Sequence, residues 1–78
     1  MPRLEKMKFI DELGTLDSRI ANAQATADGA RDSTERRAAH ATLLRLQEQR
    51  NALLKRAGVN EDQAARIQQE IAAIKSQQ

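Results

Sequence analysis

The 78-residue sequence has no cysteine, no tryptophan and no tyrosine, and its only aromatic residue is Phe9. Without cysteine, disulfides and thiolate metal ligands are excluded, and His40, the only histidine, cannot build a zinc site by itself. With one aromatic residue, the chain lacks the stacking surfaces on which single-stranded nucleic acids bind. We therefore expect no metal, no cofactor and no recognition of unpaired bases.

Long apolar runs are absent as well. Charged residues interrupt the apolar ones throughout the N-terminal MPRLEKMKFIDEL, so the apolar region of a signal peptide is missing. No apolar run approaches the roughly 18 residues of a membrane span. These features predict a cytoplasmic protein that does not enter the membrane.

Catalytic patterns are also missing. The three glycines do not form a glycine-rich phosphate loop. A catalytic nucleophile needs an adjacent base and an orienting carboxylate, but the hydroxyls near His40 stand at ordinary helix and cap positions. The acidic pairs, Asp11 with Glu12 and Glu61 with Asp62, project from different faces or lie at a helix start. We expect no catalytic residue and no enzymatic activity.

The sequence is rich in apolar residues at helical spacing. In three segments they recur in steps of three and four, which is the pattern of one helix face, and no alternating β-branched run predicts a strand. We expect three helices, about residues 3–28, 33–57 and 61–76, in a single domain of residues 1–78. The stripes contain Phe9, Leu13, Leu16, Ile20, Ala23, Ala27 and Ala30, then Ala39, Leu43, Leu46, Leu53 and Ala57, and finally Ala64, Ile67, Ile71 and Ile74.

Capping residues mark the ends of these helices. We expect Gly29 to take the left-handed conformation that ends the first helix, and Asp32 or Ser33 to cap the second. Gly58 ends the second helix, and Asn60 caps the third. The breaks predict short connections between helices and no flexible linker.

The helix lengths predict an elongated all-α fold. A first helix of about 25 residues is roughly 37 Å long, whereas a compact globule of this chain length has a radius of gyration of about 11–12 Å. We expect a long antiparallel helical hairpin with coiled-coil-like packing, whose leucine-rich half is covered if the shorter third helix folds back along the second. The hairpin leaves apolar residues uncovered, so we expect a homodimer. Its predicted oligomer seam contains Phe9, Leu13, Leu16, Ile20, Leu43, Leu46, Arg50 and Leu53.

Arg50 interrupts the apolar stripe of the second helix. One interpretation gives it a carboxylate partner, because in a hairpin that turns near residue 30 it lies level with Ile10, close to Asp11 or Glu12. In the other interpretation its stem follows the edge of the stripe and its guanidinium reaches water. The sequence leaves both interpretations open.

The segment LLKRAGVNEDQAARIQQEI, residues 53–71, has the spacing of a helix-turn-helix. Its turn is Gly58 followed by Val59, but the first turn of the recognition helix would carry Glu61 and Asp62. Two carboxylates there would face the DNA phosphates, and the preceding helix is too long for the motif. We interpret the segment as a structural corner between two helices.

Positive charge is concentrated in the middle of the chain. Residues 31–56 carry seven basic and three acidic side chains, a net charge of +4, whereas residues 1–30 and 57–78 each carry −1. Arginines of this band can bind an acidic protein, neutralise phosphates, or only solubilise the helix through pairs such as Arg45 with Glu48. The predicted partner-binding residues are Arg31, Arg36, Arg37, His40, Leu44 and Arg45.

Fold and charge together predict a small non-enzymatic module that binds another protein through its helix faces, as an adaptor, a chaperone-like subunit or an inhibitor. The alternative is a small basic regulator that binds duplex DNA or structured RNA through Arg31, Arg36 and Arg37. A purely structural oligomeriser cannot be distinguished from the first by sequence. Nine arginines against four lysines, with abundant alanine, are typical of a high-GC bacterial or phage origin. No motif identifies the partner or a family.

Overall fold

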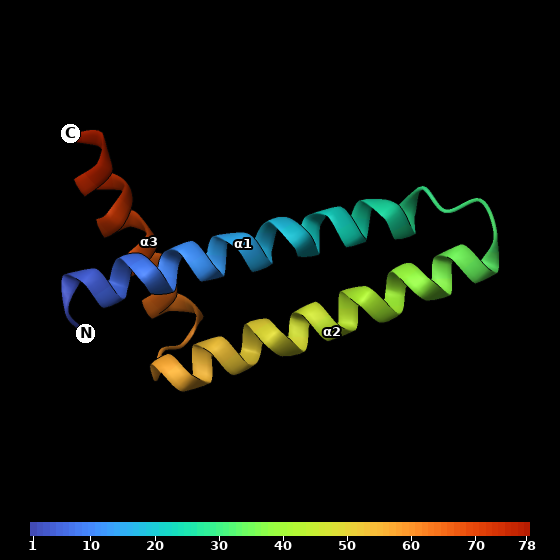
Figure 1. Ribbon diagram of the computed structural model, residues 1–78, viewed down its shortest axis with the longest axis horizontal. Coiled ribbons are helices and arrows are strands. Elements are labelled where there is room, and N and C mark those ends of the chain that lie inside the picture. Colours follow the sequence, from blue (N-terminus) through green and yellow to red (C-terminus); the bar gives the residue numbers. More distant parts are fainter.

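The computed structural model describes all 78 residues and contains three α-helices and no strand. Helix α1 spans Arg3–Asp28, α2 spans Ser33–Ala57 and α3 spans Glu61–Ser76 (Figure 1). The three-helix, all-α prediction is confirmed. None of the three helices combines the length and the apolar character that a membrane span requires.

Side chains and backbone geometry fix the helix ends. The Asp32 side chain accepts a hydrogen bond from the Glu35 N–H at 2.8 Å, so Asp32 is the N-cap of α2. Asn60 caps α3 through a reciprocal pair with Gln63, in which each side chain accepts from the other backbone N–H at 2.8 Å. Gly58 ends α2 with a left-handed φ of 71°. The chain therefore turns sharply between α2 and α3.

Gly29, which follows α1, does not have the predicted left-handed conformation. Its φ is −91° and its ψ is 1°, and its N–H donates to the Ala25 carbonyl at 3.0 Å. The chain then continues outward and reaches Asp32 in an extended conformation with φ −139°. As a result α2 begins beyond the end of α1 (Figure 1). We call this end, formed by the last turn of α1, residues 29–32 and the first turns of α2, the tip.

Two buried clusters hold α1 and α2 side by side (Figure 1). One lies toward the tip and joins the second half of α1 to the middle of α2. The other joins the first half of α1 to the end of α2, so α2 runs back toward the start of α1. The buried members are Ala23, Leu43 and Leu46 in the first cluster, and Phe9, Leu13, Leu53, Leu54 and Ala64 in the second.

The eight residues predicted for an oligomer seam lie between α1 and α2 of one chain. Leu13, for example, is 0 % exposed, and burial of a leucine side chain contributes about 1.5–3 kcal/mol. These side chains already pack within the chain, so their pattern in the sequence does not require a second copy, and the homodimer stays a prediction. Five of the eight are buried and three half-buried: Phe9, Leu13, Leu43, Leu46 and Leu53, then Leu16, Ile20 and Arg50.

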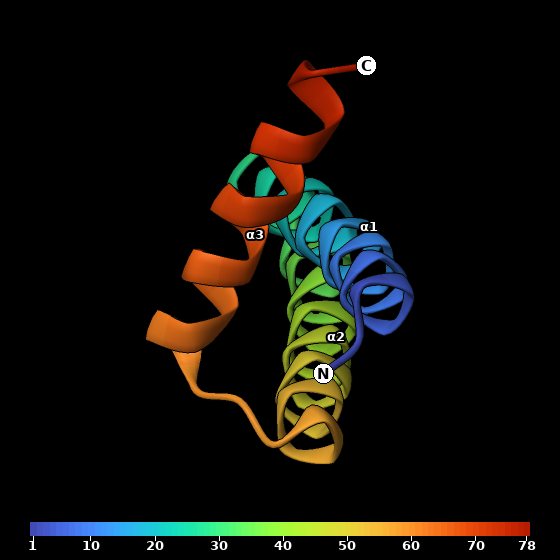
Figure 2. The same cartoon turned by 90° about the vertical axis from the view of Figure 1, so that its left-hand side faces the viewer.

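Helix α3 packs on α1 and does not fold back along α2. Ile71 of α3 is 1 % exposed, and the Lys6 Nζ donates to both carboxylate oxygens of Glu70 at 3.1 and 3.0 Å. Near its start, Ala64 of α3 lies in the same buried cluster as Leu53 and Leu54 of α2. Figure 2 shows α3 on one flank of the α1–α2 pair, which leaves the other flank free.

Arg50 connects the three helices. Its Nε donates to Asp17 Oδ1 of α1 at 2.6 Å, and its Nη1 donates to both carboxylate oxygens of Glu61 of α3 at 2.6 Å. These hydrogen bonds, first that of Glu61 and then that of Asp17, raise the pKa of the guanidinium, while burial opposes them. The partners are therefore Asp17 and Glu61 and not the predicted Asp11 or Glu12.

The molecule is elongated, as its helix lengths predict. Its radius of gyration is 15.0 Å and its principal extents are 46 × 26 × 17 Å, against about 11–12 Å for the radius of a compact chain of this size. Because α3 crosses α1 far from the tip, the tip half consists of two helices alone (Figure 1). Side chains there are accordingly more exposed than at the α3 end.

Candidate functional site

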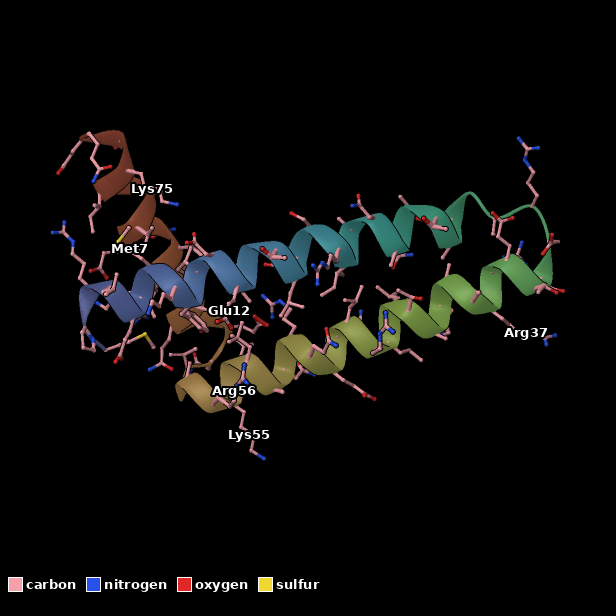
Figure 3. All side chains as sticks on the ribbon, viewed as in Figure 1. Met7, Glu12, Arg37, Lys55, Arg56 and Lys75 are labelled. Carbon is pink, nitrogen blue, oxygen red and sulfur yellow. The ribbon has the colours of Figure 1, made fainter.

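Four basic side chains in the α3 half of the molecule are paired with carboxylates, namely Lys6, Arg50, Arg56 and Lys75. Figure 3 shows Arg56 and Glu12 facing each other across the α1–α2 pair, with Nη2 and Oε2 3.9 Å apart. The Lys75 Nζ lies 3.7 Å from Asp11 Oδ1. The other pairs are those of Lys6 with Glu70 and of Arg50 with Asp17 and Glu61. All five salt bridges of the molecule therefore lie outside the tip.

At the tip, by contrast, the acidic side chains are engaged by groups other than arginine side chains. Asp32 caps α2, and Glu35 Oε2 accepts from the backbone N–H of Arg31 at 3.3 Å. Asp28 Oδ1 accepts from the side-chain amide of Gln24 at 3.0 Å. The carboxylates thus stabilise the connection between α1 and α2 and do not hold the arginine side chains.

The three arginines of the tip have no ion pair within the chain. Arg31, Arg36 and Arg37 are exposed and form none of the five salt bridges of the molecule. Figure 3 shows Arg37 projecting away from the molecule at the start of α2. Since a guanidinium presents its donors in a rigid fork that matches a carboxylate, these side chains are available to an acidic ligand.

Two of these arginines border a groove at the tip. Helix α1 contributes its last turn and α2 contributes one face, on which Arg37, Ala41 and Leu44 follow one another at helical spacing. Leu44 is 48 % exposed, one of three large apolar side chains with such exposure. We call this site the tip groove; its lining residues are Ala27, Asp28, Ser33, Arg36, Arg37, His40, Ala41 and Leu44.

Four of the six predicted partner-binding residues meet in the tip groove, namely Arg36, Arg37, His40 and Leu44. Arg31 stands in the adjoining loop, and Arg45 lies outside the groove, beside Arg19 and Gln49. Sequence reasoning missed the small residues that shape the floor, because Ala27 and Ala41 look like ordinary stripe and spacer residues until α1 and α2 are placed together.

The formal charge of the tip is balanced. Arg31, Arg36 and Arg37 carry three positive charges, and Asp28, Asp32 and Glu35 carry three negative charges. A balanced patch has little long-range field to attract a polyanion. Short-range hydrogen bonds from the free guanidinium groups remain, together with the apolar contact that Leu44 offers. The site therefore favours a ligand with a few carboxylates and an apolar side over an extended phosphate backbone.

The corner between α2 and α3 has a different character. Glu61, at the start of α3, is held by Arg50, and Asp62 is exposed beside it. No group of three or more His, Asp or Glu side chains could hold a metal ion anywhere in the chain. No protein-family model, no curated protein and no solved structure matches this chain.

Proposed function

We propose that this protein is a non-enzymatic interaction module that binds an acidic, amphipathic segment of a partner protein in the tip groove. The α1–α2 pair acts as an antiparallel, coiled-coil-like hairpin that carries the groove away from the α3 end. The observation that supports the proposal is the placement of two unpaired arginines, Arg36 and Arg37, beside the exposed Leu44 in one groove.

The partner segment is expected to be a helix. Its apolar side would lie on Leu44 and Ala41, and its carboxylates would accept hydrogen bonds from Arg36 and Arg37. An adaptor, a chaperone-like subunit and an inhibitor can each use such a contact in the cytoplasm of a bacterial cell. The alternative ligand is duplex DNA or structured RNA, which the balanced charge of the tip disfavours.

Fluorescence anisotropy with synthetic ligands tests the proposal. The probe is a labelled helical peptide in which Leu and Glu recur at helical spacing, and its control is the same peptide with Lys in place of Glu. We expect the chain to bind the acidic peptide and not the basic one. Arg36→Glu and Arg37→Glu should each weaken binding about tenfold or more, since a charge-assisted hydrogen bond is worth about 1.5–3 kcal/mol. Leu44→Asp should weaken it as well, because it places a charge in the apolar contact.

Arg66→Glu is the matched control, because Arg66 is exposed, unpaired and remote from the tip groove. It makes the same change of charge and should leave peptide affinity unchanged. Equal affinity for the two peptides, or affinity for neither, would contradict the proposal. So would tight binding of labelled duplex DNA or hairpin RNA that falls by orders of magnitude between about 50 and 200 mM salt.

A further inference from the structure

The free flank of the α1–α2 pair carries a second groove, which shares no lining residue with the tip groove. No residue of α3 lines it, and Figure 2 shows no helix packed on this side. It lies along both helices, toward the α3 end of the pair. We call it the flank groove; its lining residues are Asp11, Glu12, Thr15, Leu16, Arg19, Gln49, Ala52, Leu53 and Arg56.

The centre of the flank groove is apolar and bordered by small side chains. Leu16 is half-buried and Leu53 is 6 % exposed, and these two leucines form the floor. Thr15 and Ala52 are exposed on either side. Since the distance between packed helices depends on the side chains at the contact, small residues at this level allow another helix to approach closely.

Charge changes sign along the α1 edge of the groove. Asp11 and Glu12 stand at one end, and Arg19 stands at the other, about 10 Å further along the helix. Thr15 lies between them. Arg19 is exposed and forms no ion pair within the chain. The groove thus has an acidic end, a small apolar centre and a basic end.

We propose that the flank groove is the interface of a two-fold symmetric homodimer, in which α1 packs antiparallel on α1 of a second copy. A two-fold axis that crosses both helices at the level of Thr15 and Ala52 maps the groove onto itself. It sets Arg19 of each copy opposite Glu12 of the other and brings the small residues together at the centre. The charge pattern therefore complements a second copy of itself.

A parallel arrangement fits the charges less well. Its axis would run along the helices and place α1 on α2 of the second copy, with Glu12 opposite the second copy's Arg56 and Arg19 opposite its Gln49. Arg56 already faces Glu12 of its own chain at 3.9 Å, whereas Arg19 has no partner. The antiparallel arrangement is the one that gives the unpaired charge a partner.

Sedimentation equilibrium with charge-swapped variants tests this interface. We expect the natural chain to dimerise at micromolar concentration, and Arg19→Glu and Glu12→Arg each to weaken dimerisation at least tenfold by placing like charges opposite each other. The double variant Glu12→Arg with Arg19→Glu restores both pairs and should recover the dimer. Arg66→Glu, which changes charge outside both grooves, should dimerise like the natural chain. Helical circular dichroism verifies that each variant is folded.

Three results would overturn the proposal: a natural chain that stays monomeric up to about 300 µM, an Arg19→Glu variant that dimerises normally, or a double swap that does not recover. In the parallel arrangement Glu12 lies opposite Arg56 of the second copy, so recovery of the dimer by the double variant Glu12→Arg with Arg56→Glu would show that arrangement instead. If Glu12→Arg does not fold, single cysteines decide, because the natural chain has none. Oxidation should form a disulfide between the two copies of the Thr15→Cys variant, because this residue lies next to the two-fold axis. It should not link the Thr26→Cys variant, because residue 26 of one copy would lie roughly 30 Å from residue 26 of the other.

Discussion

Replacing Arg50 by methionine separates the contribution of its charge from that of its packing. The methionine side chain still covers the apolar stripe between α1 and α2, but it removes the hydrogen bonds to Asp17 and Glu61. Both contacts are lost at once, and one of them holds the start of α3. We therefore expect α3 to be released more often from the α1–α2 pair.

The size of the effect follows from the exposure of the partners. The Arg50 side chain is 21 % exposed, but the side chains of Asp17 and Glu61 are 40 % and 63 % exposed. Solvent screens such pairs, so each contributes at most about 0.5–1 kcal/mol, and the freed carboxylates are hydrated without a large penalty. The expected loss is about 1–2 kcal/mol, which lowers the melting temperature of so small a domain by roughly 5–15 °C.

Thermal unfolding followed by circular dichroism measures this loss. Arg56→Met is the matched control, because its contact with Glu12 is 3.9 Å long and both side chains are more than 60 % exposed, so its melting temperature should stay near that of the natural chain. Hydrogen exchange locates the effect, with faster exchange expected in α3 and unchanged exchange toward the tip. If Arg50→Met and Arg56→Met melt at the same temperature, Arg50 does not hold the three helices together.

Two further perturbations test the backbone of the corner and the docking of α3. Gly58→Ala should lower the free energy of unfolding by about 1 kcal/mol, because the φ of 71° at this position strains a residue with a Cβ. Gly14→Ala should raise the free energy of unfolding by about 0.5–1 kcal/mol, because Gly14 lies inside α1 and nothing lies within 4 Å of an added Cβ. Their urea midpoints must move in opposite directions. The Ile71 side chain is 1 % exposed, so Ile71→Ala should lower the free energy of unfolding by about 2–4 kcal/mol. Ile74 is half-buried, so Ile74→Ala should lower it clearly less. Equal losses in the two variants would contradict the packing of α3 on α1.

The register of α1 against α2 illustrates what the sequence cannot determine. A hairpin turning near residue 30 places Arg50 beside Ile10, but in the structure Arg50 pairs with Asp17. The two registers differ by seven residues, and a stripe that repeats every seven residues matches itself after such a shift. The shift arises because the chain continues past α1 at Gly29 before α2 begins. Helices and caps are local properties, whereas register depends on the path of this loop.

The candidate site was accessible from sequence only in part. The arginines of the tip are recognisable in the sequence because they lie in a basic band. Leu44 is recognisable because it is an apolar residue beside the buried stripe of the second helix. The groove between them depends on how the last turn of α1, with Ala27 and Asp28, meets α2, which the same loop decides. The position of α3 was equally hidden, because Ile67 and Ile71 fit either α1 or α2 until the turn at Gly58 is known.

The two proposed surfaces are compatible and together favour one role among those considered. The tip groove and the flank groove share no residue, so each copy in the proposed dimer keeps its tip groove open. The antiparallel arrangement directs the two tips in opposite directions, with their grooves roughly 30–40 Å apart. An inhibitor needs one such groove, but two grooves on opposite ends can hold two partner chains at once. We therefore propose the adaptor role for a dimer of this geometry, and we expect a variant locked as a monomer to keep the affinity of a single groove and to lose only the bridging.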